Sequence, residues 1–382
     1  MNNPVWTIAL ALALAGCTGA GAERVQEPGT SERPFAVEAV ATLDEPWAMA
    51  FLPDGSMLVT ERKGALKRVS ASGAVGDVIG APTVDYGGQG GFGDVALHPR
   101  HAGNHWVYLS YAEAGEGDTR GAAVARATFE PDGDGGRLTS LEVIWRQVPK
   151  VSGRGHYGHR LLFGPDGKLW ISSSERQKFD PAQDMQTNLG KIVRLNDDGS
   201  VPADNPFVAQ GGVAAQIWSL GHRNVLGMDF DARGRLWEVE MGPKGGDELN
   251  IVRRGANYGY PIVSNGDHYD GTPIPDHDTR PEFAAPALWW TPVISPSNLL
   301  IYSGTMFPQW RGNALISGLS SQALVRVAFD GESAHEVERF DMGRRIRSVE
   351  QGPDGAVWLL EDGRAGRLLR LVPRATEEPA AR

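Results

Sequence analysis

One turn motif recurs six times along this 382-residue chain, and such recurrence restricts the fold to a repeat architecture. Each copy has a glycine in a polar turn and a large apolar residue three positions later. The glycines are Gly55, Gly103, Gly167, Gly234, Gly312 and Gly355. The apolar residues are Leu58, Trp106, Trp170, Trp237, Leu315 and Trp358. The average spacing of 60 residues exceeds the roughly 40–50 residues of a compact propeller blade, so we expect inserted loops in some repeats.

The motif also indicates what each repeat contains. Glycine supplies the positive φ angle that tight hairpin turns need, and alternating apolar residues behind it are typical of a half-buried strand. The 49 glycines are about twice the usual number, which is consistent with many turns. Asp-Gly turns occur in many β-rich proteins, so one copy would mean little. Six copies that all have a large apolar residue three positions after the glycine favour an all-β fold, and we predict a six-bladed β-propeller.

The N-terminal segment has features of an export signal. Residues 8–16 form an apolar run that is too short to span a bilayer and is typical of a secretory signal. The run ends in Leu-Ala-Gly-Cys at 14–17, which resembles a bacterial lipobox, so we expect cleavage before Cys17 and lipid attachment to its sulfur. Residues 1–7 lack Lys and Arg, and an ordinary cleaved signal is therefore the alternative. The prediction is a periplasmic protein held at the outer membrane by its lipid alone.

This interpretation divides the chain into four parts. The parts are a signal peptide at 1–16, a small and polar tether at 17–34, the propeller at 35–373 and a loose tail at 374–382. Cys17 is the sole cysteine, which excludes an intramolecular disulfide and a cysteine-based zinc site. A net charge of −10 without a dense Lys/Arg block argues against nucleic acid as a partner, because duplex binding depends on cationic contacts to phosphate.

Polar loops in five different repeats are candidates for a binding site. They occupy residues 87–91, 155–160, 221–224, 240–248 and 344–347. Propeller loops converge at the central channel, so we expect these five stretches to meet there and to bind a ligand together.

Several stretches, in order along residues 45–372, resemble the soluble quinoprotein aldose sugar dehydrogenases (the glucose/sorbosone dehydrogenase family). They include Glu-Pro-Trp-Ala-Met-Ala-Phe at 45–51, Gly-Gln-Gly-Gly at 88–91, Leu-Gly-Lys-Ile-Val-Arg-Leu at 189–195, Ile-Trp-Ser-Leu-Gly-His-Arg-Asn at 217–224 and Gly-Gly-Asp-Glu-Leu-Asn at 245–250. The resemblance implies an enzyme that depends on pyrroloquinoline quinone (PQQ) and Ca²⁺. Such an enzyme oxidises the C1 hydroxyl of an aldose to a lactone and passes electrons to an external acceptor. We expect a monomer or a homodimer.

The resemblance implies catalytic roles for three residues. His156 is at the position of the family's catalytic base, and a neutral imidazole can take the proton of the anomeric hydroxyl. Arg223, beside Asn224, would contact the quinone and stabilise negative charge on its oxygens. Asp247 corresponds to a family active-site acid. His159, where the family usually has a small residue, is interpreted as structural.

The remaining cofactor contacts implied by the resemblance are polar side chains. Gln89 and Arg176 match polar positions of the pocket, and Arg223 and Asn224 belong to the same set. Arg345 and Arg347 alternate along one predicted strand and therefore share a face. They match arginines that bind the cofactor's carboxylates, a contact that guanidinium groups can make in bidentate fashion.

The resemblance also implies two calcium sites. The backbone carbonyls of Gly242 and Pro243 would bind the ion that contacts the cofactor, and calcium accepts carbonyl ligands readily. Glu248 and the carbonyl of Tyr258 would form a second, structural site.

Three residues depart from the family pattern near the cofactor, and they leave other functions open. Met241 and Leu226 stand where the family commonly has polar residues, and Ser320 replaces a lysine that anchors the quinone. Losing one charge-assisted bond would weaken binding roughly ten- to a hundredfold. A non-catalytic binding propeller is therefore the first alternative. A calcium-dependent, lactonase-type hydrolase is the second, although it needs a channel cage of carboxylates and Asn that the sequence does not obviously provide.

Overall fold

The fold is almost entirely β-structure. The structure is a computed structural model that describes residues 32–374, and over these residues it has 24 strands. Helical segments are short: one helix, α1 (His101–Asn104), and the 3-10 turns Asp180–Ala182, Val208–Gln210, Ala214–Gln216, His277–Thr279 and Pro308–Trp310. None of the helices in this part of the chain is long and apolar enough to cross a membrane. The predicted all-β class is confirmed.

The strands form five sheets, and four of these are antiparallel sheets of four strands. One contains β10 (Gly158–Phe163), β11 (Leu169–Ser173), β12 (Lys191–Leu195) and β13 (Ile217–Leu220). The next contains β14 (Val225–Phe230), β15 (Leu236–Glu240), β16 (Asp247–Val252) and β17 (Leu288–Trp290). A third contains β18 (Pro296–Ile301), β19 (Ala314–Gly318), β20 (Ala323–Asp330) and β21 (Ser333–Asp341). The fourth contains β22 (Ile346–Gln351), β23 (Val357–Glu361), β24 (Gly366–Pro373) and β1 (Phe35–Leu43).

The fifth sheet has eight strands, which differs from the expected six separate units. Its first half is β2 (Pro46–Phe51), β3 (Met57–Glu61), β4 (Leu66–Val69) and β5 (Val75–Ile79). Its second half is β6 (Phe92–Leu97), β7 (Trp106–Ala114), β8 (Arg120–Asp132) and β9 (Gly135–Arg146). The halves join because β5 and β9 pair in parallel over two residues each, Val78 with Gly136 and Ile79 with Arg137. The long β8–β9 hairpin brings β9 within reach of β5.

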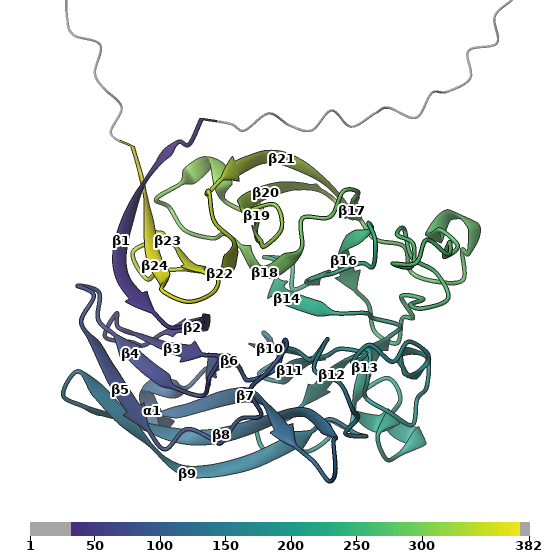
Figure 1. Cartoon of the computed structure of the whole chain (residues 1–382), viewed down its shortest axis with the longest axis horizontal. Coiled ribbons are helices and arrows are strands. Elements are labelled where there is room, and N and C mark those ends of the chain that lie inside the picture. The colour runs from purple at the N-terminus through teal and green to yellow at the C-terminus, as the bar shows by residue number, and fades with distance from the viewer. Residues whose placement is uncertain (1–31, 375–382) are drawn as a thin grey trace, which may run out of the picture.

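The sheets are arranged in a ring (Figure 1). Strands β2, β6, β10, β14, β18 and β22 surround its centre, each contacts the next, and β22 contacts β2. The first strand, β1, completes the last sheet by pairing with β24, from Phe35 opposite Pro373 to Leu43 opposite Gly366. Both ends of the described chain therefore close the ring at one place.

The recurrent turns connect each innermost strand to its neighbour, as the motif predicts. Gly55, Gly167 and Gly234 have φ angles of 83°, 71° and 75°, which a side-chain-bearing residue rarely adopts. Gly103 is different, because it lies within helix α1 instead of a tight turn. The apolar residue that follows each turn packs between sheets, and Trp237 is fully buried.

Candidate functional site

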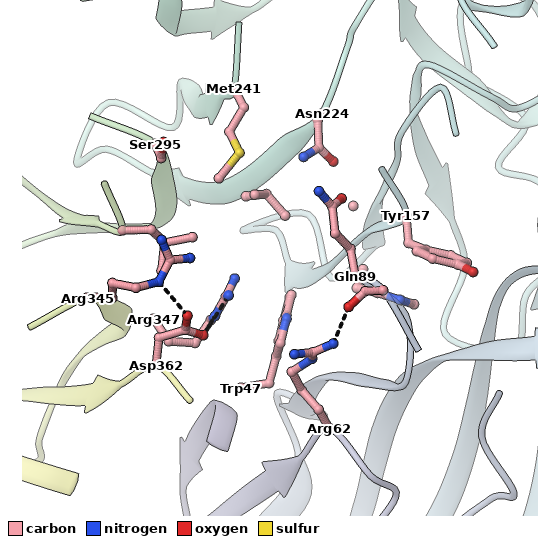
Figure 2. Close-up of a pocket in the computed structure, with 15 residues that line it drawn as sticks. Trp47, Arg62, Gln89, Tyr157, Asn224, Met241, Ser295, Arg345, Arg347 and Asp362 are labelled. Atoms are coloured by element: carbon pink, nitrogen blue, oxygen red, sulfur yellow. Dashed lines mark hydrogen bonds and ion pairs between the residues drawn. The ribbon is translucent and has the colours of Figure 1, made fainter. Parts of the chain in front are cut away.

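A cavity of about 330 Å³ lies at the end of the ring where the innermost strands begin. Its walls come from segments far apart in the sequence, including Trp47 at the start of β2, Gln89 before β6, Asn224 before β14 and Arg345 before β22 (Figure 2). Antiparallel sheets alternate strand direction, so the loops that enter the innermost strands all lie at this end. All five polar loops predicted from sequence contribute lining residues to this cavity, the loop at 240–248 through Met241 alone.

One wall of the cavity is cationic. Arg345 and Arg347 flank it and share Asp362: Arg345 Nε donates to Oδ2 at 2.8 Å, and Arg347 Nη2 donates to Oδ1 at 2.7 Å (Figure 2). Burial would raise the pKa of Asp362, but the two guanidinium groups hold it below its usual value. Two positive charges thus face one negative charge. Both guanidinium groups therefore lie against the same carboxylate, with Arg345 directly before β22 and Arg347 within it.

Arg62 adds a third guanidinium on the opposite side of the cavity. Its Nη2 donates to the carbonyl of Gly88, and its Nη1 lies 3.4 Å from Glu45 Oε2. The sequence prediction missed this residue, because it lies outside the five polar loops. It also missed Asp362, whose role depends on a contact across two strands.

Gln89 connects the cavity to the predicted base. Gln89 lines the cavity, and its Oε1 accepts a hydrogen bond from the backbone N–H of His156 at 2.7 Å. The His156 side chain is 7% exposed and lies immediately behind this wall, next to the cavity-lining Tyr157. The amide of Gln89 is therefore used, at least in part, to hold the His156 loop.

His156 forms a buried pair with Glu175, which the sequence prediction also missed. Nδ1 of the imidazole contacts Oε1 of Glu175, and Oε2 of Glu175 accepts the backbone N–H groups of Lys178 and Phe179. Burial lowers the pKa of His156 although the carboxylate opposes the shift. Burial would raise the pKa of Glu175, but the bonds it accepts bring it below normal. The lowered pKa values of His156 and Glu175 indicate a neutral imidazole that donates from Nδ1 to a carboxylate. This arrangement leaves Nε2 free to accept a proton.

Arg223 lies beside the cavity, and Asn224 lines it. The backbone N–H groups of both residues donate to Glu240 Oε2, at 2.5 and 3.2 Å, and Arg223 Nη1 donates to the carbonyl of Met241 at 2.7 Å. Glu240 at the end of β15 thus fixes the turn that presents both side chains. The predicted pair is placed together, but Arg223 contacts the cleft beyond Met241 instead of the main cavity.

Arg176 differs from its prediction. The side chain is fully buried, and its guanidinium donates to the carbonyls of Gly155 at 2.8 Å, Arg120 at 2.8 Å and Gly153 at 2.6 Å. It also lies 3.7 Å above the ring of Tyr157. These contacts occupy N–H groups of Arg176 that a cofactor would otherwise need as donors. Arg176 therefore supports the loop that carries His156 instead of facing the cavity.

Asp247 also lies behind the site. It accepts the backbone N–H groups of Gly242 at 2.9 Å and Ser295 at 2.7 Å, and burial raises its pKa to about 7. The carboxyl group joins the loop before β16 to the start of β18. This position assigns it a structural role in the wall, because its oxygens bind backbone donors and it does not line the cavity.

The residues predicted to bind calcium gather in a small cleft next to the cavity. Gly242, Glu248 and Tyr258 line it, together with Glu240 and Arg223, while Pro243 is buried in the same loop as Gly242. The cleft thus brings Gly242 of the first predicted calcium site together with Glu248 and Tyr258 of the second, so the two sites adjoin. The Tyr258 carbonyl accepts a bond from His277 Nε2 at 3.2 Å.

Behind this cleft is a group of buried acidic side chains. Among the residues with described positions, His222, Glu238 and Glu240 form a group whose ligand atoms all lie within 4.8 Å of one another. Burial alone would lower the pKa of His222, but the two glutamates raise it to about 9, so the imidazole is a cation held between acids. Carboxylate and carbonyl oxygens are the ligands that calcium prefers, and the oxygens of this region fit that ion.

The three departures from the family pattern have different positions. Met241 and Leu226 line the cavity and pack with Trp47 in an apolar cluster, so they give one wall an apolar character. Ser320 is exposed and its Oγ donates to the carbonyl of Val293 at 3.3 Å. Its neighbour Leu319 reaches the cavity instead. Arginines, and not a lysine, therefore supply the positive charge of this cavity.

Unused polar atoms at the cavity match a polar ligand. Within residues 32–374, Asn224 Oδ1 in the cavity wall and Arg223 Nε in the adjoining cleft are buried without a hydrogen-bond partner. Buried polar groups are almost always paired, since an unpaired one costs about 1–3 kcal/mol. A flat ligand with several carboxylates, such as PQQ, fits a cavity that has arginines at two sides, an apolar wall and free polar atoms.

Comparison with known proteins identifies the family. The sequence model for Glucose / Sorbosone dehydrogenase matches residues 43–370. The chain belongs to this family of oxidoreductases. It is 39% identical to the aldose sugar dehydrogenase YliI of Escherichia coli over 341 aligned residues. The alignment covers 87% of this chain and 91% of that protein.

Solved structures of the family have the same fold. The soluble aldose sugar dehydrogenase of E. coli in its apo-form superimposes with a TM-score of 0.83 at 37% identity, covering 89% of this chain and 100% of that one. The PQQ-bound aldose sugar dehydrogenase of Streptomyces coelicolor gives a TM-score of 0.75 at 28% identity, covering 90% and 99%. The glucose/sorbosone dehydrogenase resemblance predicted from residues 45–372 is confirmed.

Proposed function

We propose that this chain is a quinoprotein that oxidises the C1 hydroxyl of aldose sugars to lactones, with PQQ as cofactor and an external acceptor for the electrons. The observation that carries the proposal is the buried His156–Glu175 pair beside a cavity with arginines on two sides. The named E. coli and S. coelicolor relatives support the substrate class and the cofactor.

His156 would act as the general base. Its Nδ1 is bound to Glu175, so Nε2 takes the proton from the anomeric hydroxyl as the C1–H bond breaks. PQQ, when bound, accepts the hydride equivalent that leaves C1. The carboxylate of Glu175 keeps the imidazole in one tautomer and stabilises the imidazolium that forms, a role that a buried acid beside a histidine serves in other enzymes.

The cavity's own groups would bind the quinone. Arg345 directly before β22 and Arg347 within it share Asp362 and can pair with carboxylates, and Arg62 adds a third positive charge to the cavity lining. Asn224 offers an unpaired amide oxygen to polar hydrogens of sugar or water. The apolar surface of Trp47, Leu226 and Met241 excludes water from one side.

Calcium would be held at the cleft formed by Gly242, Glu248 and Tyr258, with Pro243 in the adjoining loop. If the backbone oxygens of Gly242 and Pro243 leave the calcium shell incomplete, the quinone must complete it, and the two ligands then bind with positive coupling. Calorimetric titration of the apoprotein with PQQ should give a lower Kd in Ca²⁺ than in a chelator. Equal Kd values would contradict this arrangement.

We also propose that the architecture is a six-bladed propeller. The six innermost strands contact one another in a closed circle, and the eight-stranded sheet consists of two antiparallel sets of four joined by only two residue pairs. Each set of four occupies one position around the ring, so the parallel pairing is a contact between two blades.

The proposed function is tested by reconstitution. Purified protein is incubated with PQQ and Ca²⁺, and dye reduction is measured with a panel of aldoses. We expect sugar-dependent reduction that requires the quinone. Tight PQQ binding without turnover on any sugar would instead support the non-catalytic binding propeller, and lactone hydrolysis without dye reduction would support the hydrolase.

A further inference from the structure

An exposed aromatic side chain lies next to the His156–Glu175 pair. Phe179 is 44% exposed, and its backbone N–H donates to Glu175 Oε2 at 2.8 Å. The other oxygen of the same carboxylate contacts Nδ1 of His156. One buried carboxylate thus positions both the proposed base and Phe179, which is an aromatic residue that solvent can reach.

The backbone that presents Phe179 is strained. Phe179 has φ 64° and ψ −92°, and Arg176 and Gln177 before it have φ angles of 62° and 58°. Bulky residues rarely adopt positive φ angles, and strain of this kind concentrates at sites that contact ligands. The strain does not serve to bury the phenyl ring, because much of Phe179 remains exposed.

The ring of Phe179 belongs to an aromatic group that extends from the calcium cleft to solvent. It stacks on Tyr260 with centroids 6.3 Å apart and planes at 29°, and it meets His268 at 5.9 Å and 64°. Tyr260 lines the cleft beside Arg223, whose guanidinium lies 5.8 Å from the Tyr260 ring. A ligand that leaves the cleft can therefore contact the exposed surface of Phe179 without displacing a side chain.

A sugar ring matches this surface. The faces of a pyranose carry C–H groups that pack on an aromatic ring, while its rim carries hydroxyl groups that need polar partners. Gln177 and Asp180 are exposed on either side of Phe179 and supply such partners. An aromatic ring provides a large and rigid apolar contact, so one residue is enough to hold a sugar face.

We propose that Phe179, supported by Tyr260, is a stacking platform for the sugar ring attached to the one that is oxidised. The inference rests on the proposed oxidation at C1 and assigns reducing disaccharides and longer saccharides to the site. Nε2 of His156 points away from Glu175, and Phe179 is bound to the far oxygen of that carboxylate. The imidazole and the carboxylate thus separate the reacting hydroxyl from Phe179, so a saccharide with its C1 at Nε2 reaches Phe179 with its next ring.

The test compares a disaccharide with a monosaccharide in the reconstituted enzyme. For Phe179→Ala we expect the KM for cellobiose to rise roughly three- to tenfold, the effect of losing one aromatic stacking contact. The KM for glucose, both kcat values and the PQQ Kd should stay unchanged. Phe179→Trp keeps an aromatic face and should retain the wild-type KM for cellobiose. Leu141→Ala removes a similarly exposed apolar side chain, 38% exposed on β9, and should change neither KM.

Two kinetic results would overturn the inference. An unchanged KM for cellobiose in Phe179→Ala would remove Phe179 from sugar binding. Equal rises for cellobiose and glucose would show that the residue only supports the His156 loop, because a second ring is present in cellobiose alone.

A binding measurement separates this inference from the proposed function. In saturation-transfer NMR on the Ca²⁺-loaded apoprotein, cellobiose should receive magnetisation at the C–H protons of its non-reducing ring, and Phe179→Ala should lose this signal. The signal in a wild type that oxidises no sugar would support the platform and overturn the oxidation. Its absence in a wild type that oxidises sugar would overturn the platform alone.

Discussion

His156 shows how far the chemistry of one side chain depends on residues that contact it. The imidazole is buried, its tautomer is selected by Glu175, and its backbone is held by Gln89. Arg176 stabilises the same loop through the carbonyls of Gly153 and Gly155, and it joins the loop to β8 through the carbonyl of Arg120. The base is therefore placed by the loop of Gln89 and the segment of Glu175 and Arg176 before any ligand binds, which lowers the cost of ordering it during catalysis.

Replacing His156 by alanine should separate catalysis from binding. We expect sugar-dependent reduction to slow by about 10²- to 10⁴-fold, the usual contribution of a positioned base, while the PQQ Kd changes little. Stopped-flow measurement of quinone absorbance after mixing with sugar gives the rate. A variant that reduces its cofactor at the wild-type rate would remove His156 from the mechanism.

The pH dependence of turnover should report the same pair. A base works only when deprotonated, and burial lowers the pKa of His156, so kcat should fall with acid at a midpoint below the ordinary value of 6.5. Glu175→Gln removes the carboxylate that raises this pKa. We expect its acid limb to move to still lower pH and its kcat to fall, because a weaker base accepts the proton less readily. A pH profile of kcat that is identical in both proteins would show that Glu175 does not act on His156.

At the scale of elements, strand β22 carries the cationic wall. Arg345, directly before the strand, and Arg347, within it, are both bound to Asp362, while Arg344 reaches towards Glu361 at 3.7 Å. The side chains differ in environment: that of Arg345 is 49% exposed and that of Arg347 is 12% exposed. An interaction with a less solvated guanidinium is less screened and therefore stronger.

We therefore expect Arg347→Ala to weaken PQQ binding more than Arg345→Ala does. Loss of a charge-assisted bond at Arg347 should raise the Kd roughly ten- to a hundredfold, with a smaller rise for Arg345. Arg344→Ala is the matched control, because this arginine is adjacent in sequence but does not line the cavity. Titration of each apoprotein with PQQ checks the order, and equal effects of all three changes would contradict it.

Strand β1 is the element that closes the ring. Phe35 is 1% exposed and packs at 5.8 Å from the ring of Trp310 and at 5.2 Å from that of Phe340, in the neighbouring sheet. The strand thus joins the last sheet by hydrogen bonds and the sheet before it by an aromatic contact.

Phe35→Ala should destabilise the whole ring and not only its edge. Removing a buried phenylalanine costs about 3–5 kcal/mol of unfolding free energy, measured by chemical denaturation. Val37→Ala on the same strand is the control, since Val37 is 36% exposed and its loss should cost well under half as much. Equal effects of the two substitutions would show that the aromatic contact is not what closes the ring.

For the whole molecule, the strand order determines which way the cavity faces. The cavity lies where β22 begins, and the strands of this sheet alternate in direction, so β24 ends and β1 begins at the opposite end of the ring. The predicted lipid site at Cys17 lies outside the described residues. A chain anchored through that cysteine would leave the propeller from the end opposite to the cavity, with the cavity open to substrate.

The anchoring prediction is tested in cells. If Cys17 is lipidated, the wild type should fractionate with membranes, and Cys17→Ala should release soluble protein with unchanged dehydrogenase activity. A Ser31→Ala protein, altered within the predicted tether, should remain with the membrane fraction. Identical fractionation of wild type and Cys17→Ala would contradict the lipoprotein assignment.

The sequence by itself determined the β class, the repeat and the loops that form the site. Turn glycines and strand alternation are local properties, so they can be recognised without knowledge of distant contacts. The same local logic located the polar loops at 87–91, 221–224 and 344–347, which precede innermost strands and meet at one cavity, while the family resemblance singled out Gln89, Asn224, Arg345 and Arg347 within them.

Only the tertiary structure decided which polar residues face that cavity. Arg176 resembles a cofactor ligand in sequence, but in the fold its donors bind backbone carbonyls. Glu175 and Asp362 have no local signal, because their roles come from side-chain partners 15 or more residues away. The pairing of β5 with β9 likewise depends on the length and direction of a hairpin. Such contacts form between segments whose sequences carry no mutual pattern, and packing alone brings them together.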